Sequence, residues 1–83
     1  MLKSVEKLVY AYENNRKKAT YGNHSMEVVN GEVRFMYHGN IVCYLNPNRN
    51  EFRLDDCGWG GYPSTTRTLN SYREAFRYMK DIS

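Results

Sequence analysis

The Asn-Gly pair at positions 30 and 31 is the sequence feature that most limits the fold of this chain. Both central residues of a type I′ turn take positive φ, and Asn-Gly is the pair that tolerates this best. Apolar and polar residues alternate on both sides of the pair, with the two-residue period of a strand that has one buried face. We therefore expect a β-hairpin with strands at about residues 24–29 and 32–37.

Further turn signals extend this hairpin into a meander. His38-Gly39-Asn40 predicts a second tight turn, and Ile41 to Leu45 predicts a third strand in which Val42 and Tyr44 point away from the core. The segment from Asn46 to Asn50 predicts a third turn, because Asn tolerates left-handed backbone and Pro presets φ. A short fourth strand then fits Phe52 and Leu54. Cys43 is expected to face the core, as are Val33, Phe35 and Tyr37.

Two amphipathic segments flank the strands. Apolar residues fall at helical spacing over residues 2–17, followed by an expected loop at Tyr21-Gly22-Asn23. A second and stronger stripe runs from Leu69 to Ile82, and Pro63 indicates that this helix begins after it. The two stripes consist of Leu2, Val5, Leu8, Val9 and Tyr12, and of Leu69, Tyr72, Ala75, Phe76, Met79 and Ile82.

These elements predict one α+β domain over residues 1–83, in the order α-β-β-β-β-α. We expect an antiparallel three- to four-stranded meander with the N-terminal and C-terminal helices packed on one face. A chain of this length buries only about 60–65% of the surface that its unfolded form exposes. Eight tyrosines, three phenylalanines and one tryptophan supply the large groups that a compact core needs.

The cellular compartment is predicted from what the chain lacks. The amino terminus has no apolar run of the secretory kind, and no stretch approaches the roughly 20 apolar residues of a membrane span. Cys43 and Cys57 do not form a CxxC pair. We expect a reduced, cytoplasmic protein without a membrane partner.

The formal net charge of +3 comes from twelve basic and nine acidic residues. This charge permits contact with nucleic acid but falls short of the clustered patch of a dedicated polyanion binder. Residues 16–18 form a small basic cluster, which fits a solvated helix end or a phosphate contact. Arg73, Arg77 and Lys80 would share one face of the second helix, which fits a solvated ridge or a surface for an acidic partner.

The glycine-rich loop before the last helix carries the only tryptophan, Trp59. Gly58 and Gly60 leave its ring little local shielding, so that the ring either folds back as a lid over the core or stands exposed as a binding anchor. Three hydroxyl residues follow Pro63. Each could cap the helix N-terminus, and together with Arg67 they could instead hold an anion there. These three residues are Ser64, Thr65 and Thr66.

The ionisable side chains match no catalytic pattern of useful specificity. The two histidines, His24 and His38, and the two cysteines do not have a common zinc spacing. A disulfide between Cys43 and Cys57 fits by loop length but not by compartment. Asp55-Asp56 fits a solvated turn better than a cation site or an acid–base pair. The sequence predicts no enzyme, no cofactor and no metal.

Several short motifs stand out in the second half of the chain. They are His38-Gly39-Asn40-Ile41-Val42, Gly58-Trp59, Ser64-Thr65-Thr66-Arg67, Leu69-Asn70 and Tyr72-Arg73. Together they resemble motifs of small bacteriophage proteins. The resemblance covers about residues 30–78 and implies a similar size, an α+β fold and no catalytic residues. The segment Gly60-Gly61-Tyr62-Pro63 looks longer than the usual pattern.

The leading hypothesis that follows is a non-enzymatic phage accessory protein that binds and inhibits or redirects a host protein. Counter-defence, such as anti-CRISPR or anti-restriction activity, and host takeover are examples of this role. Aromatic and arginine side chains are the usual anchors of such interfaces. The anchors expected here are Trp59, Tyr62, Arg67, Arg73 and Arg77.

The alternative is a nucleic-acid-binding module. The expected order of elements resembles a double-stranded-RNA-binding domain, whose last helix grips phosphates at its N-terminus. Ser64-Thr65-Thr66 stands where that domain has a lysine pair, and the fourth strand is extra. Trp59 or a sheet tyrosine would stack on a base. A homodimer through a sheet edge or through the Tyr44 surface is compatible with either function. The residues expected at phosphates are Arg67, Arg73, Arg77 and Lys80.

Overall fold

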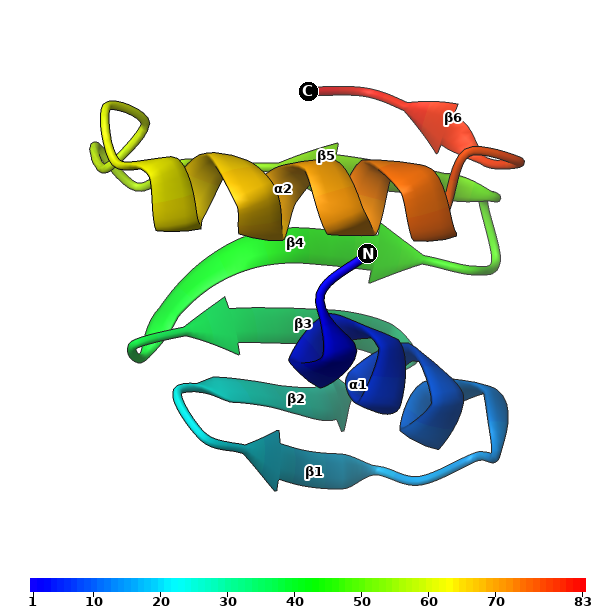
Figure 1. Ribbon diagram of the computed structural model, residues 1–83. Helices are drawn as coiled ribbons and strands as arrows, with labels where there is room; N and C mark the ends of the chain where they lie inside the picture. The colour runs from blue at the N-terminus through cyan, green and yellow to red at the C-terminus, as the bar shows by residue number, and fades with distance from the viewer.

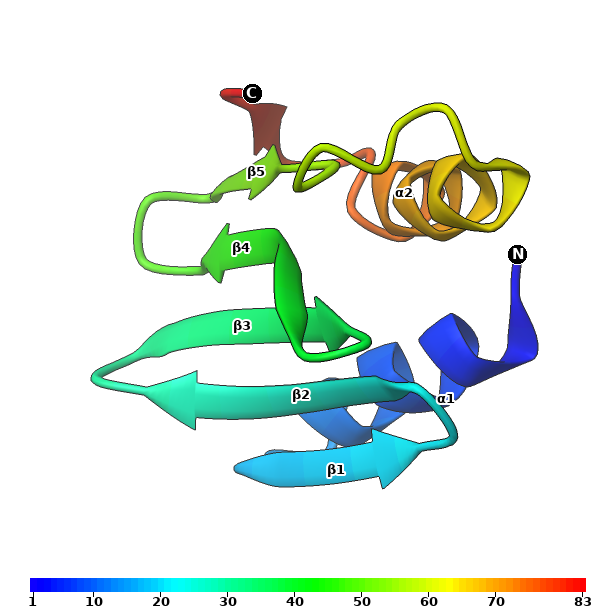
Figure 2. The same ribbon diagram turned by 90° about the vertical axis from the view of Figure 1, so that its left-hand side faces the viewer.

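Two helices cover one face of a mostly antiparallel sheet in the computed structural model, which describes residues 1–83 (Figure 1). The predicted α+β class is confirmed, and Figure 2 shows both helices on the same side of the sheet. The sheet has six strands in sequence order, so the expected number of three to four was too low. The helices are α1 (Lys3–Glu13) and α2 (Pro63–Ala75), and the strands are β1 (Lys18–Tyr21), β2 (His24–Val29), β3 (Glu32–Tyr37), β4 (Asn40–Asn46), β5 (Glu51–Leu54) and β6 (Lys80–Asp81).

The hairpin expected around the Asn-Gly pair is confirmed. Strands β2 and β3 pair antiparallel from Val29 opposite Glu32 onward, and the turn residues Asn30 and Gly31 have φ of 53° and 79°. The next turn repeats the pattern, since His38 and Gly39 have φ of 51° and 79°. Residues that accept positive φ therefore place both turns, as the sequence predicts.

The first helix ends at Glu13 rather than at residue 17. Asn15 takes the left-handed φ of 62°, and the Arg16 amide donates to the Ala11 carbonyl at 3.0 Å, which closes the helix end. The chain then forms β1, which the sequence did not predict because only Ala19 of this strand is buried. The basic cluster at residues 16–18 thus leads into an edge strand and does not continue a helix.

The second helix was predicted seven residues too long. It ends at Ala75, and a turn leads into β6, which pairs parallel with β5. Phe76 and Met79 are nevertheless buried, whereas Ile82 is 46% exposed. Phe76 and Met79 have the spacing of a helical stripe, but they are buried because the chain leaves the helix and turns back onto the sheet. Spacing alone therefore predicted a helix that was too long.

The core lies between the sheet and the two helices and contains fourteen buried hydrophobic residues. Phe35 of β3 is at its centre, with ring centroids 4.8 Å from Tyr72 and 5.6 Å from Phe76. Helix α1 adds Val5 and Leu8, both fully buried. Large aromatic side chains therefore fill the middle of the core.

A β-bulge in β4 breaks the expected alternation. Phe35 pairs with Cys43, but Met36 pairs with Ile41, so that Val42 is the extra residue. Val42 and Cys43 are consequently both buried, at 2% and 0% exposure, and the expected outward position of Val42 is wrong. Cys43 faces the core as predicted, and both cysteines are free. The bulge turns the Val42 side chain toward the loop that follows β5.

The other face of the sheet carries no helix (Figure 2). Tyr44 on this face lies under the Arg53 guanidinium, 4.4 Å from ring centroid to carbon. The Arg34 Nε lies 3.6 Å from a Glu32 carboxylate oxygen. Charged side chains thus contact their neighbours on this face, which fits the polar face that the alternating pattern predicts. Neither helix has the length and apolar character that crossing a lipid bilayer requires.

Candidate functional site

The loop between β5 and α2 is held by its own hydrogen bonds. The Cys57 amide donates to Asp55 Oδ1 at 2.8 Å, and the Gly58 amide donates to Asp56 Oδ1 at 2.9 Å. The Trp59 amide then donates to the Asp56 carbonyl at 2.8 Å. The two carboxylates therefore act as turn residues, which was the favoured interpretation of their sequence.

Three more contacts tie this loop to the rest of the fold. The Asp55 amide donates to the Val42 carbonyl at 2.9 Å, and the Cys57 thiol donates to the Ile41 carbonyl at 3.1 Å. At the other end, Thr66 Oγ1 donates to the Gly60 carbonyl at 3.3 Å. The β4 bulge and the first turn of α2 thus hold the loop from both sides.

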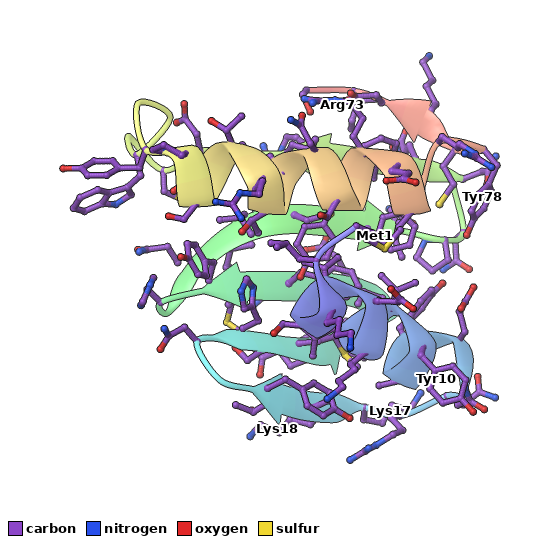
Figure 3. All side chains as sticks on the ribbon, viewed as in Figure 1. Met1, Tyr10, Lys17, Lys18, Arg73 and Tyr78 are labelled. Atoms are coloured by element: carbon purple, nitrogen blue, oxygen red, sulfur yellow. The ribbon has the colours of Figure 1, made fainter.

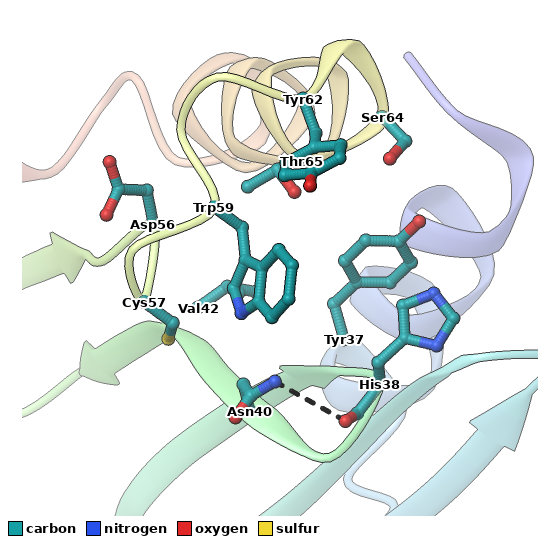
Figure 4. Close-up of a pocket in the computed structure, with 10 residues that line it drawn as sticks. All are labelled: Tyr37, His38, Asn40, Val42, Asp56, Cys57, Trp59, Tyr62, Ser64 and Thr65. Atoms are coloured by element: carbon teal, nitrogen blue, oxygen red, sulfur yellow. Dashed lines mark hydrogen bonds between the residues drawn. The ribbon is translucent and has the colours of Figure 1, made fainter.

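The loop closes one side of a hollow of about 400 Å³ (Figure 4). The turn between β3 and β4 forms the opposite side, and the start of α2 completes it. The residues that line the hollow are Tyr37, His38, Asn40, Val42, Asp56, Cys57, Trp59, Tyr62, Ser64 and Thr65.

Aromatic rings stand on both sides of the hollow. On the loop side, Trp59 and Tyr62 are 51% and 57% exposed, with ring centroids 5.3 Å apart. On the opposite side, the Tyr37 ring is 4.3 Å from His38 and stacks on His24 at 4.6 Å. Trp59 is therefore an exposed side chain at a hollow and not a lid over the core.

Cys57, which lines the hollow, and His24, which stacks on Tyr37 beside it, have shifted pKa values. Burial raises the pKa of the Cys57 thiol, and the carboxylates of Asp55 and Asp56 raise it further. This thiol stays protonated at neutral pH, which does not suit a nucleophile. Burial lowers the pKa of His24, and the nearby His38 lowers it further. The neutral form of His24 therefore predominates in the stack with Tyr37.

The helix cap expected from the three hydroxyl residues at the start of α2 is wrong. The helix begins at Pro63 with Tyr62 as the N-cap, and no side chain caps it. Proline suits the first helical position because its missing N–H would have no partner there. The amides of Thr65 and Thr66 already donate to the Tyr62 carbonyl, each at 3.1 Å. Thr65 is 4% exposed and packs inward, whereas Ser64 and Thr66 are exposed, so the three hydroxyl residues do not share one exposed surface.

The basic residues of the predicted site are dispersed. Arg67 and Arg73 lie on α2, but Arg77 and Lys80 follow the helix end, so that the expected basic ridge on one helix does not form. Arg73 donates to Asn70 Oδ1 at 2.7 Å and lies 3.8 Å from an Asp81 oxygen. Figure 3 shows Arg73 near β6, far from Lys17 and Lys18.

The structure thus divides the predicted site residues into two groups. Trp59, Tyr62, Ser64 and Thr65 line the hollow, and Thr66 supports its loop. The four basic residues lie outside it. The opposite side of the hollow is formed by Tyr37, His38, Asn40 and Val42, which were not predicted as site residues, although His38-Gly39-Asn40 is a turn motif in the sequence.

No three or more His, Cys, Asp or Glu side chains gather where they could hold a metal ion. No protein-family model matches this chain, and no curated protein and no solved structure matches it. The chemistry of the hollow is therefore the basis for a functional proposal.

Proposed function

We propose that this protein is a non-enzymatic binding protein that attaches to a partner protein through the aromatic hollow. The observation that carries the proposal is the pair of exposed rings, Trp59 and Tyr62, at the edge of the hollow. Tryptophan and tyrosine dominate the binding energy of protein interfaces. Exposure of both rings beside a hollow is typical of an interface anchor.

The loop also supports this role because it is ordered before any partner binds. Its amides are bonded to Asp55 and Asp56, and its thiol to the β4 backbone. A loop held in this way loses little conformational entropy on binding, which favours affinity. The protonated Cys57 thiol fits a binding surface better than a reaction centre.

The resemblance of several motifs to those of small bacteriophage proteins suggests where the partner is found. In that setting the partner would be a host protein in the host cytoplasm, and binding would inhibit or redirect it during counter-defence or takeover. The nucleic-acid alternative has less support, because no Lys or Arg lines the hollow and Arg73 is already paired with Asp81. A phosphate backbone needs such contacts in number.

Affinity capture from host lysate tests the proposal. The tagged wild-type protein is compared with Trp59→Ala and Tyr62→Ala, and with Tyr10→Ala, which removes an aromatic ring that is 69% exposed on α1. We expect one host protein to be enriched by the wild type and Tyr10→Ala and to be lost from the other two variants.

Capture that survives both hollow variants would show that the hollow is not the binding site. Titration with duplex and single-stranded oligonucleotides at two salt concentrations tests the nucleic-acid alternative. Binding that weakens steeply with salt would favour that alternative and contradict the proposal. Light scattering on the same samples reports whether the protein is a homodimer.

A further inference from the structure

We infer that the hollow binds the guanidinium group of an arginine side chain on the partner protein. This inference rests on the proposed function and names the chemistry of its ligand. Aromatic rings stand on both sides of a space of about 400 Å³, and Asn40, Asp56 and Ser64 also line it. A planar cation that stacks and donates several hydrogen bonds fits this set of groups.

The ring arrangement is the first argument. The rings of Trp59 and Tyr62 on the loop side and of Tyr37 on the opposite side line one space (Figure 4). The face of an aromatic ring is negative, so that a cation is attracted to it, most strongly at tryptophan. An arginine guanidinium adds stacking to this attraction because it is flat and weakly hydrated.

The local charge is the second argument. The chain has a net charge of +3, yet the hollow has one carboxylate, Asp56, and no Lys or Arg. Asp55 precedes it in the same loop. Both carboxylates act on the Cys57 thiol inside the hollow, where they raise its pKa. With no Lys or Arg at the hollow to offset this negative charge, the lining favours a cation over a phosphate.

The hydrogen-bonding groups are the third argument. The exposed Ser64 adds a hydroxyl group on the α2 side. The Asn40 amide donates to the His38 carbonyl at 3.5 Å, and its Oδ1 stays available as an acceptor. A guanidinium has five N–H donors and no acceptor, so acceptors at several points suit it better than they suit a compact ammonium.

Two small probes of equal shape test the inference. N-acetyl-arginine amide carries the cation, and N-acetyl-citrulline amide replaces it with a neutral urea group. Trp59 is the only tryptophan, so its indole N–H signal in nuclear magnetic resonance reports binding at this site alone. We expect the arginine probe to shift this signal and to bind about tenfold more tightly than the citrulline probe.

Conservative variants separate charge from structure. Asp56→Asn removes the carboxylate charge and keeps an oxygen that can accept from the Gly58 amide. Trp59→Phe keeps a ring with a weaker π face. Both variants should weaken binding of the arginine probe severalfold. Because Trp59→Phe has no indole signal, its binding is measured on the amide signals of Tyr37 and Ser64. Tyr10→Phe, on the exposed part of α1, should leave it unchanged.

Three results would overturn the inference: no binding of the arginine probe, equal binding of the two probes, or tighter binding of thymidine monophosphate. These results differ from a failure of the proposed function. If the probes bind alike while Trp59→Ala still loses the captured partner, only the arginine ligand is wrong. If Trp59→Ala retains the partner, the proposed function fails whatever the probes do.

Discussion

Replacement of Tyr72 by phenylalanine should stabilise the protein. Tyr72 is fully buried, its ring centroid lies 4.8 Å from Phe35 and 6.4 Å from Phe76, and no protein group bonds to its hydroxyl. Burial raises the pKa of this hydroxyl far above its usual value, and the neighbouring Cys43 thiol adds to the effect. The hydroxyl is thus removed from water without a hydrogen bond in return.

The size of the effect follows from these contacts. An unsatisfied buried polar group costs about 1–3 kcal/mol, and the ring contacts persist in Tyr72→Phe. Loss of one oxygen leaves a small void that offsets part of the gain. We therefore expect the free energy of unfolding to rise by about 1 kcal/mol, and the melting temperature to rise by roughly 4–8 °C in a domain of this size.

Urea unfolding followed by far-ultraviolet circular dichroism measures this change. Tyr10→Phe is the matched control, because Tyr10 is 69% exposed and its hydroxyl is already in water. That variant should stay within about 0.5 kcal/mol of the wild type. A loss of about 1 kcal/mol or more in Tyr72→Phe would show that the hydroxyl has a partner and would refute the reasoning.

Three other predictions concern the pH response, the N-terminus and the loop. The pKa of His24 is lowered on folding, so the folded state binds its proton less well than the unfolded state. The free energy of unfolding should therefore fall as the pH drops below about 6.5 and level off below the folded pKa. His24→Gln should flatten this slope in urea unfolding at several pH values. Ser71→Ala should lower the free energy of unfolding by about 1 kcal/mol, because Ser71 Oγ accepts from the Leu2 amide at 3.0 Å and donates to the Arg67 carbonyl at 2.9 Å. Hydrogen exchange at the start of α1 should become faster in this variant. Gly58→Ala should lower the free energy of unfolding by about 1 kcal/mol, because Gly58 has a φ of 83°, which alanine adopts poorly. A change in Trp59 fluorescence should report the altered loop.

The candidate site was only half predictable from the sequence. Trp59 and Tyr62 could be singled out because glycines beside an aromatic residue imply poor local shielding, a property of neighbouring residues. Tyr37 and Val42 had no such signal. Their places in the hollow depend on the β3–β4 register and on the bulge, which form between segments that meet only in the folded chain.

The sequence by itself determined the features that depend on contiguous residues. Positive-φ residues such as Asn30 and Gly31 place the turns, and the two-residue and helical periods establish an α+β fold with both helices on one face. Only the tertiary structure decided that Lys18–Tyr21 and Lys80–Asp81 are strands, that α2 ends at Ala75, and that the basic residues are dispersed. Short strands have too few residues for a periodic signal, and their hydrogen bonds come from distant segments. The aromatic hollow belongs to this second group, because its two sides come from parts of the chain that only the sheet and the loop bring together.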